Sequence, residues 1–187
     1  MKKLLFLLGA LALTLAACNN EDNEDNGPAE NTISYDGPNA TAPFLPTGIH
    51  ELAARFTSQE LTNYVGRELA EVSFFIANIP QTCTIKIYGE GTRDAPGALL
   101  YSATVSNSLA PFSWNYHRIQ APIEIGGDDL WISIAVTHSN DLQSVGCDAG
   151  PADPNGDLIL LDGDGAWSTY RTLANESINW NIRGIIE

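Results

Sequence analysis

Short runs in which apolar and polar residues alternate follow one another along most of the chain, and they constrain its fold more than any other feature. A period of two places every second side chain on the same face, as in a half-buried β-strand. In the run Thr82–Tyr88, Cys83, Ile85 and Ile87 alternate with polar residues. We therefore expect these three side chains to face the protein interior.

About nine such runs predict strands, and turn residues separate them. They cover residues 49–57, 69–77, 82–88, 99–105, 113–120, 123–125, 130–137, 158–161 and 178–186. The segment Thr57-Ser58-Gln59-Glu60 fits a capping box and predicts one or two helical turns over residues 58–64. Because no helical run connects two strands, parallel βαβ units are not expected. The predicted fold is all-β, an antiparallel β-sandwich with jelly-roll topology.

The first 17 residues have the composition of a targeting segment. Lys2 and Lys3 precede an uncharged apolar run over residues 4–17, which is shorter than the roughly 20 residues that span a bilayer. This pattern is typical of a signal peptide. The run ends in LAAC at Cys18 and resembles the bacterial lipobox, which implies that Cys18 is acylated and becomes the mature N-terminus. Ordinary secretion with an unmodified Cys18 is the alternative.

Residues 18–31 follow as a segment rich in Asp, Glu and Asn. Such a segment cannot bury enough surface to offset its ordering entropy, so we predict a flexible acidic tether. An acidic run behind a lipidated cysteine also resembles the surface-export signal of Bacteroidetes lipoproteins. We expect an outer-membrane lipoprotein exposed at the cell surface, with a periplasm-facing position as the alternative, and a single β-sandwich domain over residues 32–187.

The charge balance limits the classes of partner. The chain has 9 Lys and Arg against 23 Asp and Glu, which gives a net charge of −14. Nucleic-acid binding needs a basic surface and is not expected. An anionic membrane surface also repels so acidic a protein, so we assign membrane attachment to the acyl group on Cys18.

Two further cysteines, Cys83 and Cys147, lie in a chain that is expected to be exported. Disulfides persist outside the cytoplasm, and we predict that these two residues pair. A bridge would close a long loop and stabilise the fold by roughly 4 kcal/mol. Two separate thiols are the alternative.

Motifs of catalysis are missing from the sequence. It has no G-x-S-x-G, no H-E-x-x-H, no C-x-x-C and no glycine-rich phosphate loop. His50, His117 and His138 are far apart, and none has a second ligand at metal-binding spacing. We therefore predict no catalytic residues and no enzyme, although triads and carboxylate pairs need not be adjacent in sequence.

Two acidic, glycine-rich loops offer candidate ligands for a cation. They read DAGPADPNGD over residues 148–157 and DGDGAW over residues 162–167. Carboxylates and carbonyls in such turns suit Ca²⁺, but Asp and Gly are also the commonest turn formers. Asp148, Asp162 and Asp164 are the candidates for a structural calcium, and ordinary turn chemistry is the alternative.

Four aromatic residues near loops and strand ends are candidate ligand contacts: Trp114, Tyr116, Trp167 and Tyr170. A ring beside carboxylates is a common way to hold a sugar, because the ring stacks on C–H groups and the acids accept hydroxyl protons. Rings that cap the open ends of a small sandwich are the alternative. Trp131 shares a strand face with Ser133 and Ala135 rather than with its apolar neighbours.

Several segments resemble a known family. They are residues 53–76 (AARFTSQELTNYVGRELAEVSFFI), 84–91 (TIKIYGEG), 96–105 (PGALLYSATV), 147–151 (CDAGP), 156–167 (GDLILLDGDGAW) and 179–187 (NWNIRGIIE). Together they are similar to the adhesin and haemagglutinin modules that accompany gingipain proteases in Bacteroidetes surface proteins. The resemblance implies a jelly-roll module like the galactose-binding domains, without catalytic residues, in which calcium falls on the acidic loops.

These observations predict a membrane-anchored lipoprotein whose β-sandwich binds a carbohydrate or a host protein, as an adhesin-like module. A structural or assembly subunit of a cell-envelope complex, acting by protein contact, is the second hypothesis. A small hydrolase is the third. No cofactor other than calcium is expected.

Overall fold

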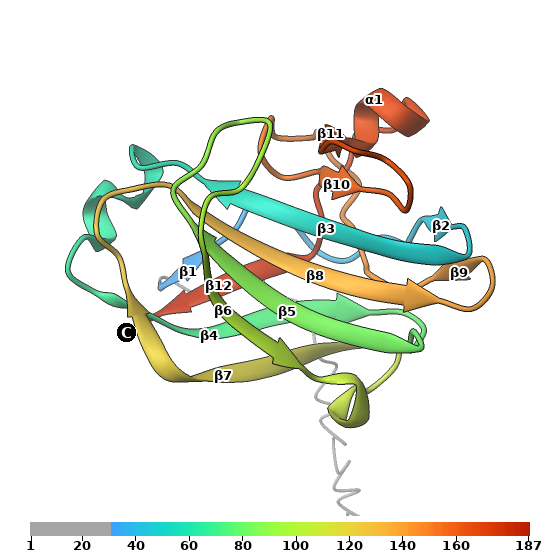
Figure 1. Cartoon of the computed structure of the whole chain (residues 1–187), viewed down its shortest axis with the longest axis horizontal. Coiled ribbons are helices and arrows are strands. Elements are labelled where there is room, and N and C mark those ends of the chain that lie inside the picture. Colours follow the sequence, from blue (N-terminus) through green and yellow to red (C-terminus); the bar gives the residue numbers. More distant parts are fainter. Residues whose placement is uncertain (1–30) are drawn as a thin grey trace, which may run out of the picture.

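The computed structural model describes residues 31–187 (Figure 1). The predicted signal peptide, the lipidated Cys18 and all but the last residue of the predicted tether lie outside the described residues and stay predictions. Every strand pair in the described chain is antiparallel. The prediction of an antiparallel jelly-roll β-sandwich is confirmed.

The larger sheet has six strands, with β8 in the middle and β6 at an open edge (Figure 1). β8 pairs with β3 on one side and with β5 on the other over almost its whole length. In the order of the sheet, the strands are β11 (Ser168–Thr169), β10 (Leu158–Leu160), β3 (Gly48–Phe56), β8 (Leu130–His138), β5 (Thr82–Gly89) and β6 (Leu99–Thr104).

The smaller main sheet packs against the first and has four strands. In order they are β1 (Thr32–Ile33), β12 (Ile182–Ile186), β4 (Glu68–Ile76) and β7 (Ser113–Glu124). The sequence predicted two strands where β7 is one. A bulge explains the difference, because Leu69 pairs with Ile123 while Glu71 pairs with Arg118, so the extra residues of β7 are accommodated without ending the strand.

Short elements complete the fold. β2 (Phe44–Leu45) and β9 (Leu142–Gln143) form a separate pair, and the 3₁₀ turn η2 (Ser106–Ser108) follows β6. The capping box is confirmed at the 3₁₀ helix η1 (Glu60–Tyr64), where the Thr57 N–H donates to Glu60 Oε2 at 2.8 Å. The sequence did not predict the one-turn helix α1 (Tyr170–Ala174), which ends at a left-handed Asn175.

The core lies between the two main sheets. The alternating residues Cys83, Ile85 and Ile87 of β5 all belong to this core, as the two-residue period of the sequence predicted. Gly184 of β12 allows the sheets to approach, because a Cβ there would stand 2.8 Å from Ile132 Cδ1 of β8. No helix within residues 31–187 is long and apolar enough to cross a membrane.

The predicted disulfide between Cys83 and Cys147 is wrong in this structure, in which both residues are free, buried thiols. Strand pairing explains why they do not meet. Cys83 lies in the larger sheet, opposite Val136, whereas Cys147 bridges Thr41 and Trp180 beside the smaller one. Burial raises the pKa of each thiol to about 12.

Cys83 and Cys147 are therefore expected to resist alkylation by iodoacetamide at neutral pH while the protein is folded, because the thiolate is the reacting form. Both should react fully once the unreduced protein is unfolded in urea. Peptide mass spectrometry of the two samples measures this difference. A Cys83–Cys147 cross-linked peptide in the unreduced protein would contradict the structure.

His138 connects the stability of the sandwich to pH. Its buried ring hydrogen-bonds the Ser144 hydroxyl at 2.8 Å. It lies edge-on to the buried ring of His50, with the ring centroids 5.4 Å apart. Burial lowers the pKa of His138, and the neighbouring His50 acts in the same direction. The folded state therefore binds a proton at His138 more weakly than the unfolded chain does.

The free energy of unfolding is expected to fall as the pH drops below about 6.5, the ordinary pKa of histidine. Below that pH the unfolded state takes up the proton first, so the contribution of neutral His138 is lost as the pH approaches the folded pKa. Urea unfolding midpoints from about pH 7.5 to about 5.5 measure the slope. His138→Gln, which keeps a partner for Ser144, should flatten it, and an equal slope in both proteins would contradict this account.

Candidate ligand-binding face

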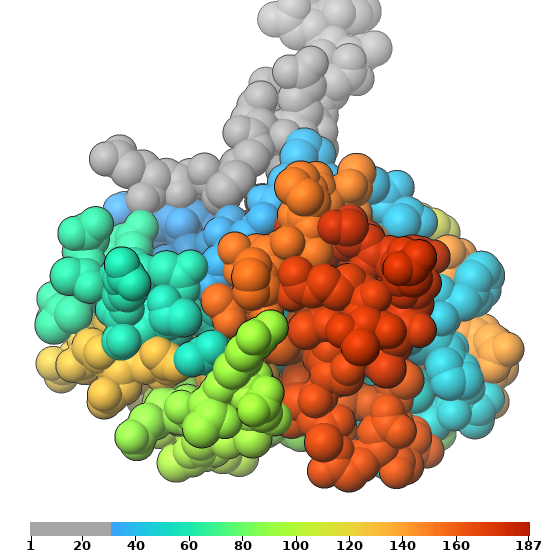
Figure 2. Space-filling model, turned by 90° about the horizontal axis from the view of Figure 1, so that it is seen from above, coloured from blue at the N-terminus to red at the C-terminus, as the bar shows by residue number. Residues whose placement is uncertain are grey.

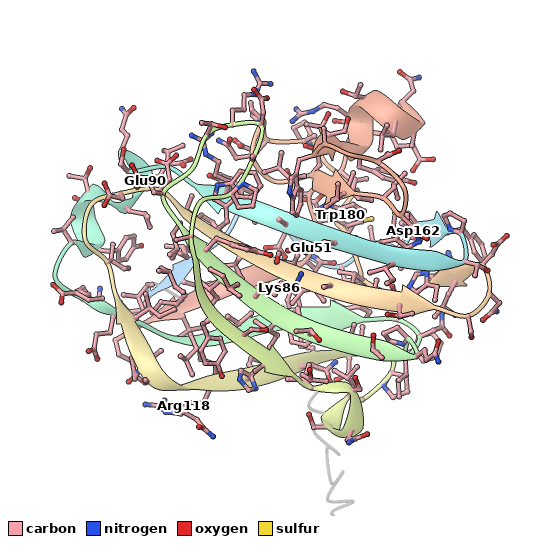
Figure 3. All side chains as sticks on the ribbon, viewed as in Figure 1. Glu51, Lys86, Glu90, Arg118, Asp162 and Trp180 are labelled. Atoms are coloured by element: carbon pink, nitrogen blue, oxygen red, sulfur yellow. The ribbon has the colours of Figure 1, made fainter. Side chains whose placement is uncertain are left out.

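The outer face of the six-stranded sheet carries a cluster of polar side chains. Leu52 and Ile132 point into the core, so their neighbours on the same strands, Glu51 and Ser133, point outward. Lys86 pairs across the strands with Ser133. Figure 3 shows Glu51 and Lys86 close together over the middle of this sheet.

Glu51 is the centre of this cluster and is only 7% exposed. Its Oε2 accepts a charged hydrogen bond from Lys86 Nζ at 2.6 Å. Its Oε1 accepts from the Tyr88 hydroxyl at 2.8 Å and from Ser133 Oγ at 2.6 Å. A buried carboxylate needs such partners to offset its desolvation. The network holds Lys86 and Tyr88 in fixed positions at the surface of the sheet.

Tyr88 remains a hydrogen-bond donor over the whole physiological pH range. Burial raises the pKa of its phenol, and the hydrogen bond to Glu51 and its charge raise it further. The neutral hydroxyl donates to Glu51 and keeps a lone pair that can accept. Lys86 uses one of its N–H donors in the bond to Glu51, and its side chain is partly exposed. The cluster can therefore both donate hydrogen bonds to a ligand and accept them.

An apolar cluster adjoins the polar one on the same outer face. It consists of Ala53, Trp131 and Leu158, with Tyr88 and Trp167 packed against them. The Trp131 and Trp167 rings meet edge-on, with centroids 5.3 Å apart. Trp131 is fully buried, whereas Trp167 is partly exposed. The side chain of Trp167 thus borders the polar cluster as an aromatic surface.

The structure separates the four aromatic residues that the sequence singled out. Trp167 lies on the outer face of the six-stranded sheet. Tyr170 is buried in the core against Trp180, with ring centroids 5.2 Å apart, so it is not available to a ligand. Trp114 and Tyr116 lie on β7 of the opposite sheet. The four rings do not form one site.

Trp114 has a structural partner. The Arg183 guanidinium lies over its ring at 3.8 Å from the centroid, and Arg183 Nε also donates to both oxygens of the buried Asp36. Cation–π stacking and this ion pair attach the segment after β1 to the smaller sheet. Tyr116, by contrast, is 65% exposed and provides a matched control for Trp167.

The three candidate calcium ligands are not brought together. Within residues 31–187, no group of three or more His, Cys, Asp or Glu side chains is arranged to hold a metal ion. Asp148 is buried and accepts hydrogen bonds from the N–H groups of Gly37, Gly150 and Asn179. Asp162 and Asp164 are exposed on the loop before Trp167. Asp148 instead acts as a loop clamp, an acceptor that joins three loop segments through their N–H groups.

A pocket of about 270 Å³ opens at the end of the sandwich beside the candidate face. Leu61, Leu100 and Leu130 line it together with acidic residues that include Glu90 and Asp128. Figure 2 shows the lime segment after β5, which contributes Glu90, next to the orange segment after β10. These two segments flank the outer face of the larger sheet.

Sequence reasoning missed Glu51, Lys86 and Ser133, the polar centre of this face. A signal was present, because Glu51 interrupts the apolar stretch of its strand and Lys86 occupies a polar position of the alternating run. Alternation shows that these side chains lie opposite the core. It does not show that three strands bring them together, because that depends on strand order and register.

No protein-family model matches the chain, and no curated protein matches it. Two solved structures share its fold at 12% identity over 86% of the chain. One is the clostridial cysteine protease Cwp84 after propeptide cleavage, with a TM-score of 0.56 and 41% of that chain covered. The other contains the cysteine protease and lectin-like domains of Cwp84, a surface-layer-associated protein of Clostridium difficile, with a TM-score of 0.57 and 36% covered. The chain thus spans about two-fifths of the solved chains, and the likeness concerns the fold.

Proposed function

We propose that this chain is a surface-associated, non-catalytic module that binds carbohydrate on the outer face of its six-stranded sheet. The observation that carries the proposal is the buried Glu51, which fixes Lys86 and Tyr88 beside the partly exposed ring of Trp167. Sugar recognition combines directional hydrogen bonds to hydroxyls with stacking of C–H groups on a ring. On this face, hydrogen-bonding side chains and an aromatic ring lie next to one another.

The shared fold supports a lectin-like module. The matched chains contain a protease part and a lectin-like part, and this chain covers only about two-fifths of them. Because the chain is an antiparallel β-sandwich, we assign the match to the lectin-like part. The resemblance to gingipain-associated adhesin modules remains a prediction that agrees with this assignment. Anchoring through an acyl group on Cys18, at the outer membrane and exposed on the cell, is part of the same proposal.

Protein contact is the second candidate function, and the exposed aromatic residues at the start of β7 favour it. Phe112 is 74% exposed and Tyr116 is 65% exposed. Phe112 also has a φ of 51°, a conformation that is costly for a bulky side chain. Large exposed aromatic rings are typical of contact surfaces between proteins.

A glycan array with the purified full chain tests the proposal, with calcium and with chelator in parallel. Trp167→Ala should weaken any glycan binding about tenfold, which corresponds to about 1.4 kcal/mol, because stacking on the ring is lost. Tyr116→Ala, an exposed aromatic on the opposite sheet, should bind as the native protein does. Tyr88→Phe should weaken binding without changing the fold.

Three outcomes would contradict the proposal. The absence of glycan binding in both conditions would favour the protein-contact function. Equal losses in Trp167→Ala and Tyr116→Ala would place the ligand elsewhere. Binding that needs calcium would relocate the site to the acidic loops. Membrane anchoring is tested separately, since Cys18→Ser should abolish incorporation of labelled fatty acid.

A further inference from the structure

We infer that the ligand is a neutral glycan chain of several sugar units that lies across the strands from Trp167 to the open edge at β6. This inference rests on the proposed function and names the class of carbohydrate that the face recognises. It goes beyond a single terminal sugar, which would need only one end of the face.

Strand pairing arranges the outward side chains in rows that cross the sheet. Glu51 pairs with Ala135, Ala135 with Thr84, and Thr84 with Thr104. The neighbouring row consists of Ala53, Ser133, Lys86 and Ser102. Each row crosses three intervals between strands of about 4.8 Å, so it is about 14 Å long. That span is longer than one sugar ring.

The rows carry hydroxyl groups and small side chains rather than unpaired charges. Lys86 and Glu51 neutralise one another. The Thr84 and Thr104 hydroxyls lie 3.2 Å apart on adjacent strands, and each can still donate or accept a further hydrogen bond. The net charge of −14 also repels polyanions. A chain of uncharged, hydroxyl-rich sugar units matches this chemistry.

Exposure increases along both rows toward the edge of the sheet. Ser133 and Ala53 are fully buried, Lys86 and Thr84 are partly exposed, and Ser102 and Thr104 are exposed. Among residues 31–187, β5 is the only strand that pairs with β6. The side chains of both rows are therefore covered at the β3 end and accessible at β6, so a glycan chain can lie over the accessible end and reach the aromatic ring of Trp167.

The carboxylate network prepares this face for binding. Glu51 already holds Lys86, Tyr88 and Ser133 by three short hydrogen bonds. Binding to groups that are fixed beforehand costs less conformational entropy than binding to mobile side chains. Fixing these binding groups beforehand gives a role to a charged residue that is buried on the outer side of a sheet, where a threonine would pair with its neighbours at lower cost.

The test measures binding as a function of glycan length. The full chain is titrated calorimetrically with neutral oligosaccharides of two and of six units from the cello-, xylo-, manno- and laminari- series, and with hexagalacturonate as an anionic probe. The expected result is at least tenfold tighter binding of a neutral hexasaccharide than of its disaccharide. The double variant Thr84→Val/Thr104→Val removes both hydroxyls of a pair at little cost in stability. It should weaken hexasaccharide binding several-fold and leave the disaccharide unchanged.

Thr169→Val/Thr172→Val is the matched control, since it removes another pair of exposed hydroxyls, 2.7 Å apart, beyond β10. It should bind both lengths as the native protein does. Equal affinities for two and six units, a preference for hexagalacturonate, or equal effects of the two double variants would overturn the inference while the proposed function stands. Binding that is insensitive to Trp167→Ala, or no binding to any probe, would overturn both.

Discussion

Replacing Asp148 by alanine is expected to lower the free energy of unfolding by about 3–5 kcal/mol, measured by urea denaturation at neutral pH. Its Oδ1 accepts from the Gly150 N–H at 2.8 Å and from the Asn179 N–H at 2.7 Å. Its Oδ2 accepts from the Gly37 N–H at 3.1 Å and from Asn179 Nδ2 at 3.0 Å. Each donor left unsatisfied in the interior costs about 1–3 kcal/mol, and water can recover only part of that cost.

This effect follows from the position of Asp148 in the fold. The residue joins three segments that are far apart in sequence, namely the lead-in after β1, the loop that begins at Cys147 and the approach to β12. Without it, these segments lose a common acceptor at the same time, so the loss should exceed that of one ordinary hydrogen bond.

Asp164→Ala is the control, because Asp164 is exposed and belongs to the other predicted calcium loop. Its stability should stay within about 0.5 kcal/mol of the native value. Asp148→Asn keeps one acceptor oxygen, so its free energy of unfolding should lie between those of the two alanine variants. If Asp148→Ala and Asp164→Ala were equally mild, Asp148 would not be the clamp that the structure indicates.

The case of Asp148 shows where the sequence was informative. Composition and alternation predicted the strands and their inward faces, because both follow from local periodicity and burial. The residues of the acidic loops were recognised as special, and both calcium binding and ordinary turn chemistry were left open for them. Whether an Asp in a loop meets a cation or a set of N–H groups depends on which distant segments pass beside it, and Gly37 is 111 residues away.

The same limit applies to the candidate site. Trp167 was identified because an aromatic residue followed acidic turn residues, and it does border the polar cluster. Tyr170 looked equivalent in sequence but turns into the core, because the one-turn helix α1 rotates it toward Trp180. Glu51 and Lys86 were passed over because their significance depends on β3, β8 and β5 being neighbours.

Replacing Trp131 by alanine is expected to destabilise the protein by about 3–5 kcal/mol, the usual cost of truncating a fully buried large aromatic side chain. Trp131 lies on the outer side of its sheet, on the face that the alternation of β8 predicted, yet it is fully buried. Its burial depends on Leu158 and Trp167, which pack over it from the end of the chain. Urea denaturation measures the loss.

Trp131→Phe separates the packing of this ring from its polar atom. The indole N–H is buried and has no hydrogen-bond partner among the described residues, so phenylalanine loses packing volume but no hydrogen bond. We expect Trp131→Phe to destabilise the protein less than half as much as Trp131→Ala.

Trp167→Ala should destabilise the protein less still, because that ring is partly exposed. The double variant Trp131→Ala/Trp167→Ala should show a coupling of about 0.5–1.5 kcal/mol between the two rings. Independent effects of the two substitutions on the free energy of unfolding would mean that Trp131 does not hold the Trp167 ring in place. The ring of Trp167 in the proposed binding face would then lack its support.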